Sequence, residues 1–571
     1  MKVELSFHNR YYPWTEISID DVTCWLKGTI FYENKLLESV DVVRLFSSAL
    51  EDSQYDHDSL KALLLALNGN FALALETPHY IFCTVDRVRS IPLFYAVDRN
   101  EVLFSDDANH LQGCLNLPFN EDNGAEFLVT GYVTGPDTLF DGVSQLQAGE
   151  YLVYDKANGS LAMHFYHRFW HGNFFSDSED DLLDRLDEVF MRVFQRLIES
   201  AKGRQIVVPL SGGLDSRIIV AMLKRLGVED VICFTYGKKG NREAEISRQV
   251  AEALGYRWYF VEYTREKWYA CYHSDEMQRY MKYSGNLVSI PHIQDFLAVR
   301  DLKEEGIISE NAVFVPGHSG DMLAGSWIPH DIEEIPHDVD CCITHSLKRH
   351  YSLWQWNKNE KLREIFQENI RNAIGNINIH DAESLSNGIE YFNFNERQVK
   401  FIVNSVRVYE FLGFQWRIPL WDAELIGFFL RIPLALRIKQ ILYREYAMKK
   451  LCVERLKVLQ KLDCTTDIGN NACVDPAQNI MTFVRKFPLL MNIGRKIYSL
   501  WRVHTEYDNF PFAWYGILPK KQFLQIYSGT EVIESFLGPS YINNVSPSTL
   551  RPLVEIHFKE ASQRQLKLRN I

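Results

Sequence analysis

Residues 207–223 read Val-Val-Pro-Leu-Ser-Gly-Gly-Leu-Asp-Ser-Arg-Ile-Ile-Val-Ala-Met-Leu. A short apolar run that breaks into Ser-Gly-Gly and then into a helical pattern predicts a strand, a tight loop and the start of a helix. Glycine accepts positive φ angles, so the loop can bring backbone N–H groups close to an anion, and the helix start adds its positive end. The stretch therefore predicts an anion site at the end of a buried strand.

The side chains of this loop suggest that the anion is a nucleotide with a metal. Ser211 and Ser216 can donate hydrogen bonds to phosphate oxygens. Asp215 would repel a bare phosphate, so we expect its carboxylate to reach a Mg²⁺ that the phosphates share. The Gly-Lys-Ser/Thr ending of a Walker A loop is absent. The alternative is an ordinary strand-to-helix turn, which commonly carries Gly and Ser.

The loop resembles the Ser-Gly-Gly-x-Asp-Ser motif of the ATP pyrophosphatases, which cut ATP between its α- and β-phosphates. The resemblance implies ATP-binding roles for Leu210, Ser211, Gly212, Gly213, Leu214, Asp215 and Ser216.

Length and composition limit the number of domains and the kinds of partner that this protein can have. The 571 residues, 46% of them hydrophobic and 24% charged, suffice for two or three globular domains. A net charge of -13 argues against nucleic acid as the main partner. No window is as long as a membrane span and residues 1–6 do not resemble a signal peptide, so we expect a cytoplasmic protein without a membrane span. The ten cysteines include no Cys-x-x-Cys, and we expect reduced core thiols.

The first third of the chain alternates short β-type runs with turn residues, which predicts a β-rich sandwich with flanking helices. The expected strands are 23–32, 71–76, 80–85, 93–97, 102–105 and 149–154, and the expected helices are 40–50 and 59–67.

Four ordered blocks in this region resemble the N-terminal glutaminase domain of glutamine-dependent asparagine synthetases. The blocks are 67–75, 86–95, 131–136 and 142–149. The resemblance implies an Ntn-hydrolase-like fold over residues 1–165. In that family the nucleophile is a cysteine directly after the initiator Met, with its own α-amino group as base.

The expected glutamine pocket departs from the family at four places. Lys2 replaces the nucleophilic cysteine, and the nearest cysteine, Cys24, lies inside a predicted strand. Lys27-Gly28-Thr29 replaces Asn-Gly-Glu, Asn68 replaces an acidic residue, and no Arg-Gly motif precedes Cys24. We therefore predict that this domain has lost glutamine hydrolysis and serves to pack against its neighbour.

Strands alternate with helices from residue 175 to residue 462, which predicts a doubly wound parallel sheet, with ligands at the carboxyl ends of its strands. The expected elements are the helix 180–200, the strand before Ser211, the strand 231–237, the helix 243–254, the strand 258–262 and the strand that begins at Val313. The resemblance to the asparagine synthetase family continues here and implies an ATP-pyrophosphatase domain with a helical subdomain. It adds Tyr236, Pro316 and Gly317 to the ATP-binding residues.

The metal ligands implied by the resemblance are Asp215, Asp321 and Glu243. Residues 313–321, Val-Phe-Val-Pro-Gly-His-Ser-Gly-Asp, match the family's strand and Ser-Gly-Glu-Gly-Ser-Asp-Glu loop, with His318 at the loop glutamate and Asp321 at the metal carboxylate. Two hard oxygen ligands suit Mg²⁺. A plain helix N-cap is the alternative for Asp321.

The catalytic residues implied by the resemblance are His318, Arg444 and Lys449. His318 could deprotonate an incoming amine, donate a hydrogen bond to the substrate, or have no role. The family's lysine for the α-phosphate falls on Glu445, so Arg444 or Lys449 would have to replace it. Arg417 and Asp422, in a structural block of the family, could form an ion pair.

Past residue 462 the family pattern fades, and residues 463–571 read as a helical extension. We expect a surface loop at 463–475, an aromatic run at 507–518 and helices at 530–537 and 548–559. Basic residues at 485–486, 495–496 and 502 are read as a solvated helix face.

The resemblance covers about residues 20–460 and implies an AMP- and pyrophosphate-forming amide ligase of EC class 6.3, with ATP and Mg²⁺ as cofactors. A carboxylate would be activated as its acyl-adenylate, and ammonia or another amine would then form the amide. Relatives of this architecture make asparagine, form β-lactams, close lasso peptides or are thought to amidate acidic sugars. The partners are small molecules, and a homodimer is left open. The alternative is a catalytically silent ATP-binding or structural homologue.

Overall fold

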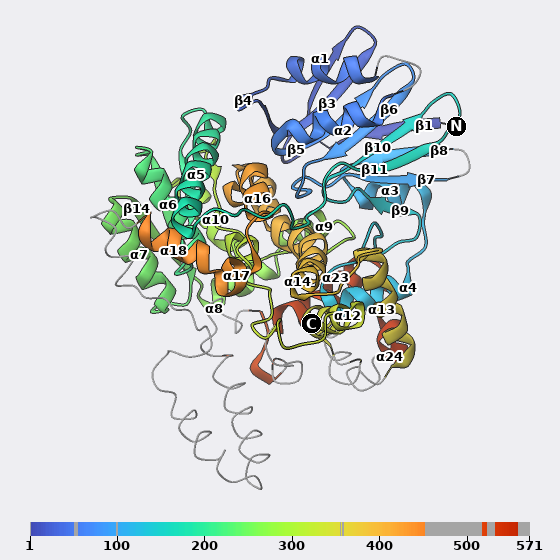
Figure 1. Ribbon diagram of the computed structural model, residues 1–571. Helices are drawn as coiled ribbons and strands as arrows, with labels where there is room; N and C mark the ends of the chain where they lie inside the picture. The colour runs from blue at the N-terminus through green and yellow to red at the C-terminus, as the bar shows by residue number, and fades with distance from the viewer. Residues whose placement is uncertain are drawn as a thin grey trace.

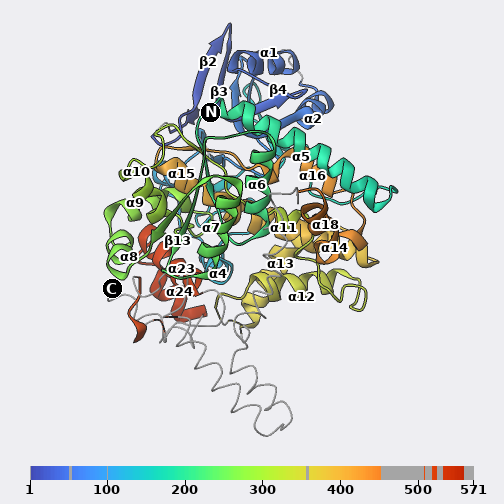
Figure 2. The same cartoon turned by 90° about the vertical axis from the view of Figure 1, so that its left-hand side faces the viewer.

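The computed structural model describes residues 2–8, 10–50, 55–98, 101–354, 356, 359–451, 507, 517–521, 523 and 532–557. The expected loop at 463–475, the basic residues at 485–502 and most of the run 507–518 lie outside these residues. Figures 1 and 2 show the N-terminal sheets stacked on a larger body of helices around a parallel sheet. Within the described residues, no helix is both long and apolar enough to cross a membrane.

Two β-sheets form the N-terminal domain, as the alternation of apolar and turn residues predicts. One sheet has the order β11-β10-β6-β5-β3-β2 with β4 paired to β3, and the other has the order β1-β8-β7-β9. The strands of the first are β2 (Thr15–Ile19), β3 (Val22–Tyr32), β4 (Lys35–Leu36), β5 (Leu67–Glu76), β6 (Tyr80–Val85), β10 (Glu150–Asp155) and β11 (Leu161–Phe165); those of the second are β1 (Lys2–Ser6), β7 (Phe94–Val97), β8 (Glu101–Ser105) and β9 (Val143–Gln145).

Alternation along the central strands explains why the larger sheet is covered on both faces. Leu73 and Leu75 of β5 pack with helices α1 (Ser39–Leu50) and α2 (His57–Ala66), whereas Ala72 and Ala74 join the main core of the protein. The six expected strands and two expected helices are confirmed, with ends that differ by up to four residues. Sequence reasoning missed β1, β2, β4, β9 and β11.

The second domain is built on a five-stranded, wholly parallel sheet of order β14-β13-β12-β15-β16. Its strands are β12 (Ile206–Pro209), β13 (Val231–Gly237), β14 (Arg257–Glu262), β15 (Val313–Phe314) and β16 (Gln415–Trp416). The chain runs outward from β12 in one direction through β13 and β14, then returns to its other side at β15. The strand order reverses between β12 and β15, which is where open parallel sheets bind ligands.

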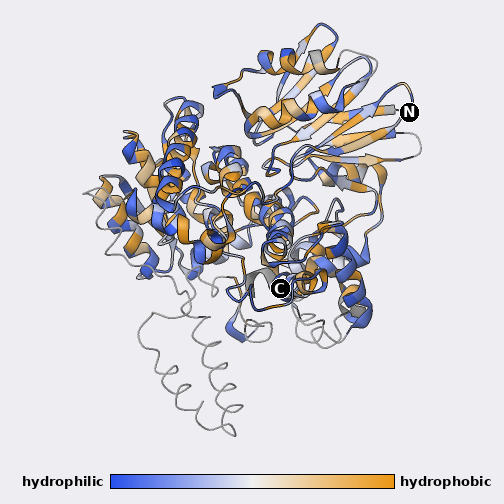
Figure 3. Ribbon diagram, in the orientation of Figure 1, coloured by the Kyte–Doolittle hydropathy of each residue, from blue (hydrophilic) through white to orange (hydrophobic). Residues whose placement is uncertain are grey.

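Amphipathic helices cover this sheet. Helix α5 buries one side of its length and caps its start with Ser178, which accepts a hydrogen bond from the Asp181 N–H. Figure 3 shows blue and orange residues alternating along it. The helices up to β15 are α3 (Ala108–Leu115), α4 (Glu121–Thr130), α5 (Glu179–Ala201), α6 (Leu214–Arg225), α7 (Arg242–Leu254), α8 (Arg265–Tyr272), α9 (Asp275–Gly285) and α10 (Phe296–Glu304).

The helices after β15 form the helical subdomain. They are α11 (Gly320–Leu323), α12 (Val339–His350), α13 (Glu360–Ile374), α14 (Ala382–Asn393), the π-helix η1 (Phe394–Ile402), η2 (Val403–Val406), α15 (Arg407–Phe411), η3 (Pro419–Trp421), α16 (Ala423–Phe429), α17 (Leu434–Arg437), η4 (Ile438–Gln440) and α18 (Ile441–Lys449). The two helices expected in the extension are present as α23 (Val532–Val545) and α24 (Leu550–His557).

Two expectations about individual side chains are wrong. Asp422 pairs with Arg196 at 2.8 Å, while Arg417 bonds to the Ser200 hydroxyl at 2.9 Å, so the ion pair between Arg417 and Asp422 does not form. The seven cysteines in the described part are free, but Cys114 is exposed on the short helix α3 and is no core thiol.

Candidate active site

The loop after β12 and the loop after β15 meet at the switch point of the parallel sheet. Pro209 ends β12, and Gly213 begins α6 with no side-chain cap. The first N–H groups of α6 are therefore available to an anion. Within the loop the Ser211 hydroxyl accepts a hydrogen bond from the Gly213 N–H at 3.1 Å and lies 3.1 Å from the Ser216 hydroxyl.

Glycine lets the two loops approach. A Cβ on Gly317 would lie 2.7 Å from the Ser216 nitrogen, and one on Gly320 would lie 2.3 Å from the Tyr443 hydroxyl. Between these glycines Ser319 takes a left-handed backbone conformation with φ 63°. The close contact between Gly317 and Ser216 thus places the residues after β15 beside the start of α6.

This approach brings Asp215 and Asp321 together. The Asp321 N–H donates to Asp215 Oδ2 at 3.2 Å, and the Tyr443 hydroxyl donates to Asp215 Oδ1 at 2.8 Å. Loss of solvation, reinforced by the neighbouring Asp321 carboxylate, raises the pKa of Asp215 to about 7. An acid held beside another acid is an arrangement that a cation stabilises.

The donor chemistry of this pair fits Mg²⁺, which proteins bind through one or two carboxylates together with substrate phosphates. The third expected ligand, Glu243, lies beside the loop, since a Cβ on Gly212 would be 3.7 Å from Glu243 Cγ. The described residues contain no group of three or more His, Cys, Asp or Glu that could hold a metal. Two carboxylates are therefore what this part of the chain offers.

The remaining residues of the expected nucleotide site lie on the same sheet. Leu210 is buried, and its N–H donates to the Phe234 carbonyl at 2.8 Å. Tyr236 lies on β13, stacks on Tyr263 with ring centroids 5.1 Å apart, and donates a hydrogen bond to Asp295. Pro316 is buried directly after β15, next to Gly317.

His318 lies deeper, on the side of the subdomain helices. Burial, assisted by the nearby His292, lowers the pKa of His318 to about 4, so the ring is neutral at pH 7. The Ser405 hydroxyl lies 3.1 Å from its Nε2. A base with so low a pKa accepts protons poorly, so hydrogen bonding suits this residue better than deprotonation of an amine.

Arg444 and Lys449 are not drawn toward the two carboxylates. Both side chains are exposed, and Lys449 pairs with Glu445 at 3.2 Å and with Asp180 at 3.8 Å. The residue of α18 that touches the site is Tyr443, which sequence reasoning missed although it directly precedes Arg444.

A different cation, Arg397 of η1, lies near enough to Asp321 for its charge to act on that carboxyl. Its charge lowers the pKa of Asp321, against the larger opposing effect of burial. The guanidinium lies 5.3 Å from the ring centroid of Trp327 and 5.7 Å from that of Phe401, and it makes no ion pair within the described residues. The next residue, Gln398, accepts a hydrogen bond from the Ser319 hydroxyl at 2.7 Å. No motif in the sequence marks either residue.

Lys27, which stands at one position of the expected glutamine pocket, is buried among polar partners. Lys27 is 4% exposed, and its Nζ lies 3.5 Å from Asp106 Oδ2. The Trp14 indole N–H donates to the same carboxylate at 2.8 Å and the His8 N–H donates at 2.9 Å. Cys24 is fully buried, and burial raises its pKa to about 12, which rules out a thiolate near neutral pH.

Comparison with known families matches both domains. Residues 198–455 match the family described as asparagine synthase, and residues 55–170 match the glutamine amidotransferase domain. The chain has the domain architecture of the asparagine synthetase family. This architecture supports a ligase-type, ATP-using amidotransferase or ligase that acts on small molecules.

Other comparisons add little. No curated protein matches the chain. The structure of the allosteric regulatory enzyme of purine biosynthesis is 12% identical, with 43% of this chain and 61% of that one covered and a TM-score of 0.18. Glutamine phosphoribosylpyrophosphate amidotransferase from B. subtilis, complexed with ADP and GMP, is 10% identical, with 52% and 62% covered and a TM-score of 0.18. The chain thus spans less than two thirds of either structure, and scores this low carry no argument.

Proposed function

We propose that this protein is an AMP- and pyrophosphate-forming ligase that joins a carboxylic acid to ammonia or another amine. The single observation that carries the proposal is the meeting of Asp215 and Asp321 across the switch point, next to an uncapped helix start. Carboxylates beside an anion-binding loop are suited to Mg²⁺ and polyphosphate together, and to neither alone.

In the proposed reaction a substrate carboxylate oxygen attacks the α-phosphorus of ATP, and the bond to the β-phosphate oxygen breaks to release pyrophosphate. The amine then attacks the acyl carbon, loses a proton, and displaces AMP to leave the amide. Asp215 and Asp321 would hold Mg²⁺, which would supply charge neutralisation at the phosphates. Serine hydroxyls and backbone N–H groups of residues 211–216 hold the departing pyrophosphate.

Other side chains of the protein would serve the α-phosphate, the adenine and the incoming substrate. Arg397, rather than Arg444 or Lys449, is the cation that would balance charge on the α-phosphate or on the substrate acid. Tyr236 and Tyr263 offer a stacked aromatic surface beside β13 for the adenine. His318 is neutral and serves as a hydrogen-bonding group toward the incoming substrate.

We infer that the nitrogen does not come from glutamine. Lys27, at a position of the expected glutamine pocket, has its ammonium group beside the Asp106 carboxylate, and Cys24 lies in the interior of β3 with a raised pKa. Free ammonia or an amine substrate is therefore the donor. The N-terminal domain has a packing role.

The second candidate is a silent ATP-binding homologue. The observation that favours it is the exposure of Arg444 and Lys449, which leaves the usual place of the family lysine without a cation at the site. The two candidates differ in whether Arg397 takes over that charge.

The test is exchange of radiolabelled pyrophosphate into ATP with Mg²⁺ and a panel of acids, including aspartate and hexuronic acids. Acid-dependent exchange that is lost in Asp215→Asn supports the ligase. A folded protein that binds ATP but exchanges pyrophosphate with none of the acids supports the silent homologue. For the active acid, amide formation with ammonium but not with glutamine identifies the nitrogen donor, and glutamine-dependent product would refute the inference that glutamine is not the donor.

A further inference from the structure

The π-helix η1 carries both residues that reach the synthetase site from the subdomain. Gln398 accepts a hydrogen bond at 2.7 Å from Ser319 in the loop after β15, and the adjacent Arg397 lies close enough to Asp321 for its charge to act on that carboxyl. A π-helix of nine residues is rare, and wide helical turns are frequently found at functional sites. The position of η1 therefore sets where the cation stands relative to the carboxylates.

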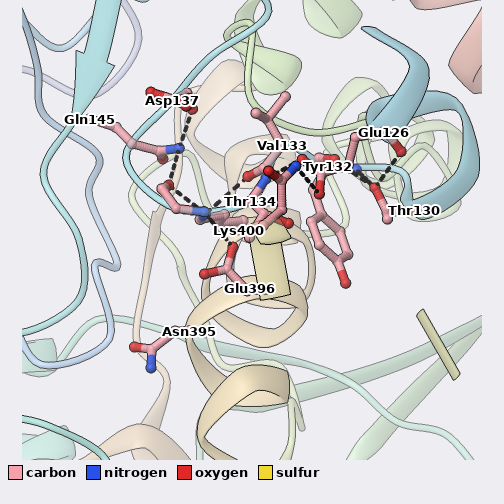
Figure 4. A network of polar contacts seen from close by, with 12 residues as sticks. Glu126, Thr130, Tyr132, Val133, Thr134, Asp137, Gln145, Asn395, Glu396 and Lys400 are labelled. Atoms are coloured by element: carbon pink, nitrogen blue, oxygen red, sulfur yellow. Dashed lines mark hydrogen bonds and ion pairs between the residues drawn. The ribbon is translucent and has the colours of Figure 1, made fainter. Parts of the chain in front are cut away.

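Another part of the surface of η1 is held by the N-terminal domain. Lys400 donates to the Val133 carbonyl at 2.9 Å, to the Gly135 carbonyl at 2.7 Å and to Glu396, while the Gly135 N–H donates to Glu396 at 3.0 Å (Figure 4). The side chains of Lys400 and Glu396 are each 1% exposed. Two charged side chains of the helix thus grip one short stretch of the N-terminal domain, with Arg397 between them in sequence.

Residues 133–137 of the N-terminal domain are also held by hydrogen bonds that do not involve η1. The Thr134 N–H donates to Glu126 at 2.9 Å, and the same carboxylate accepts from Tyr351 at 2.6 Å and Asn369 at 3.0 Å. The Gln145 amide donates to the Asp137 carbonyl at 2.8 Å. The stretch 133–137 is consequently a rigid support rather than a free loop.

Stability alone is a weak explanation for this arrangement. Burial lowers the pKa of Lys400, with the Glu396 carboxylate opposing it. A fully buried ion pair adds little net stability compared with apolar side chains of the same shape, but it fixes geometry because each charge must keep its partners. The contacts are directional at both ends, so they define the rotation of η1 about its axis.

We propose that Lys400 is a positioning residue through which the glutaminase-like domain holds Arg397 at the ATP site. The inference rests on the ligase function proposed above. It assigns to the N-terminal domain a task in the synthetase reaction that does not depend on glutamine, since removal of the 133–135 contact would let η1 turn and carry the guanidinium away from Asp321.

The experiment compares four full-length variants in the exchange assay: Lys400→Met, Arg397→Ala, the double variant, and Asn68→Ala as a matched control. Asn68 also joins the two domains, through a 2.9 Å bond to Asp422, but it lies away from η1. Lys400→Met should lower kcat roughly 10- to 100-fold, as expected for a misplaced charge, with a smaller change in the KM for ATP. Asn68→Ala should leave exchange close to that of the unchanged protein.

The double-variant cycle separates positioning from general loosening. If Lys400 acts through Arg397, then replacing Lys400 in the Arg397→Ala variant should lower the rate of pyrophosphate exchange no further. Additive losses, or equal losses in Lys400→Met and Asn68→Ala, would overturn the inference. Should Lys400→Met not fold, the variant Lys400→Met with Glu396→Gln, which removes both charges, is read in the same way.

Failure of the proposed function is distinguishable from failure of this inference. If the unchanged protein never exchanges pyrophosphate, hydrogen exchange of the backbone amides of 394–402 becomes the measurement. Faster exchange there in Lys400→Met than in Asn68→Ala supports the positioning role, and equal protection in the two variants refutes it.

Discussion

Asp106 in the N-terminal domain and Asp215 in the synthetase domain have opposite surroundings. Asp106 receives hydrogen bonds from His8 and Trp14 and has Lys27 beside it; these outweigh the effect of burial and lower its pKa. Asp215 is buried with a second carboxylate nearby, and both effects raise its pKa, to about 7. The first acid has all the partners it needs within the protein. The second is arranged to gain a partner from outside.

The comparison teaches that buried acids of one protein can differ in whether the protein itself supplies their partners. Restoring a cysteine near the N-terminus would leave Lys27 beside Asp106. The synthetase domain keeps its two carboxylates, its helix start and its close glycines together.

Asp215→Asn should give the largest effect. The amide retains the hydrogen bond from Tyr443 but loses the charge that holds a metal, so pyrophosphate exchange should fall by roughly 100- to 1,000-fold or more. The Tm should change little or rise, because the raised pKa of Asp215 shows that the folded protein disfavours its charged form. Near-normal exchange in this variant would break the contrast between the two acids.

Gly317→Ala should come next. Its new Cβ would lie 2.7 Å from the backbone nitrogen of Ser216, so one loop must shift. A shift of several tenths of an ångström separates Asp321 from Asp215, and we expect a roughly tenfold or greater loss of exchange with a higher KM for Mg·ATP. Gly113→Ala, where a Cβ meets nothing within 4 Å, is the matched control.

The pH dependence should show a smaller effect of a definite sign. Asp215 titrates near 7 in the folded protein and near 3.8 when unfolded, so the folded state binds more protons between these values. Its contribution to stability therefore falls as pH rises from about 4 to 7. The Tm of the unchanged protein should decline more steeply over this range than that of Asp215→Asn, and Mg·ATP should remove the difference. Parallel curves would contradict the raised pKa.

Sequence reasoning found the loop, its strand and the two carboxylates, because a Ser-Gly-Gly-x-Asp-Ser turn and a loop acid are local patterns whose positions on a parallel sheet follow from topology. It missed Arg397 and Lys400. Their roles depend on the width of a π-helix and on contacts with residues 133–135, more than 260 positions away in the chain. It also placed the cation on α18, where Tyr443 faces the site and Arg444 and Lys449 face solvent, since helix rotation at that point is set by packing and not by the local pattern.

Lys27→Met should give the smallest effect on activity, and it tests whether the buried Lys27 of the N-terminal domain affects the synthetase reaction. Asp106 would keep its bonds from His8 and Trp14, and the methionine would occupy a similar volume between the Tyr12 and Trp14 rings, which lie 5.4 and 5.8 Å from Nζ. We expect the free energy of unfolding to fall by about 1–3 kcal/mol for the lost charge-assisted contact, measured by denaturant titration. Pyrophosphate exchange should stay unchanged, and no glutamine hydrolysis should appear. A large loss of exchange would mean that the two domains communicate through this lysine, and would move the link between them from Lys400 to the β3 strand.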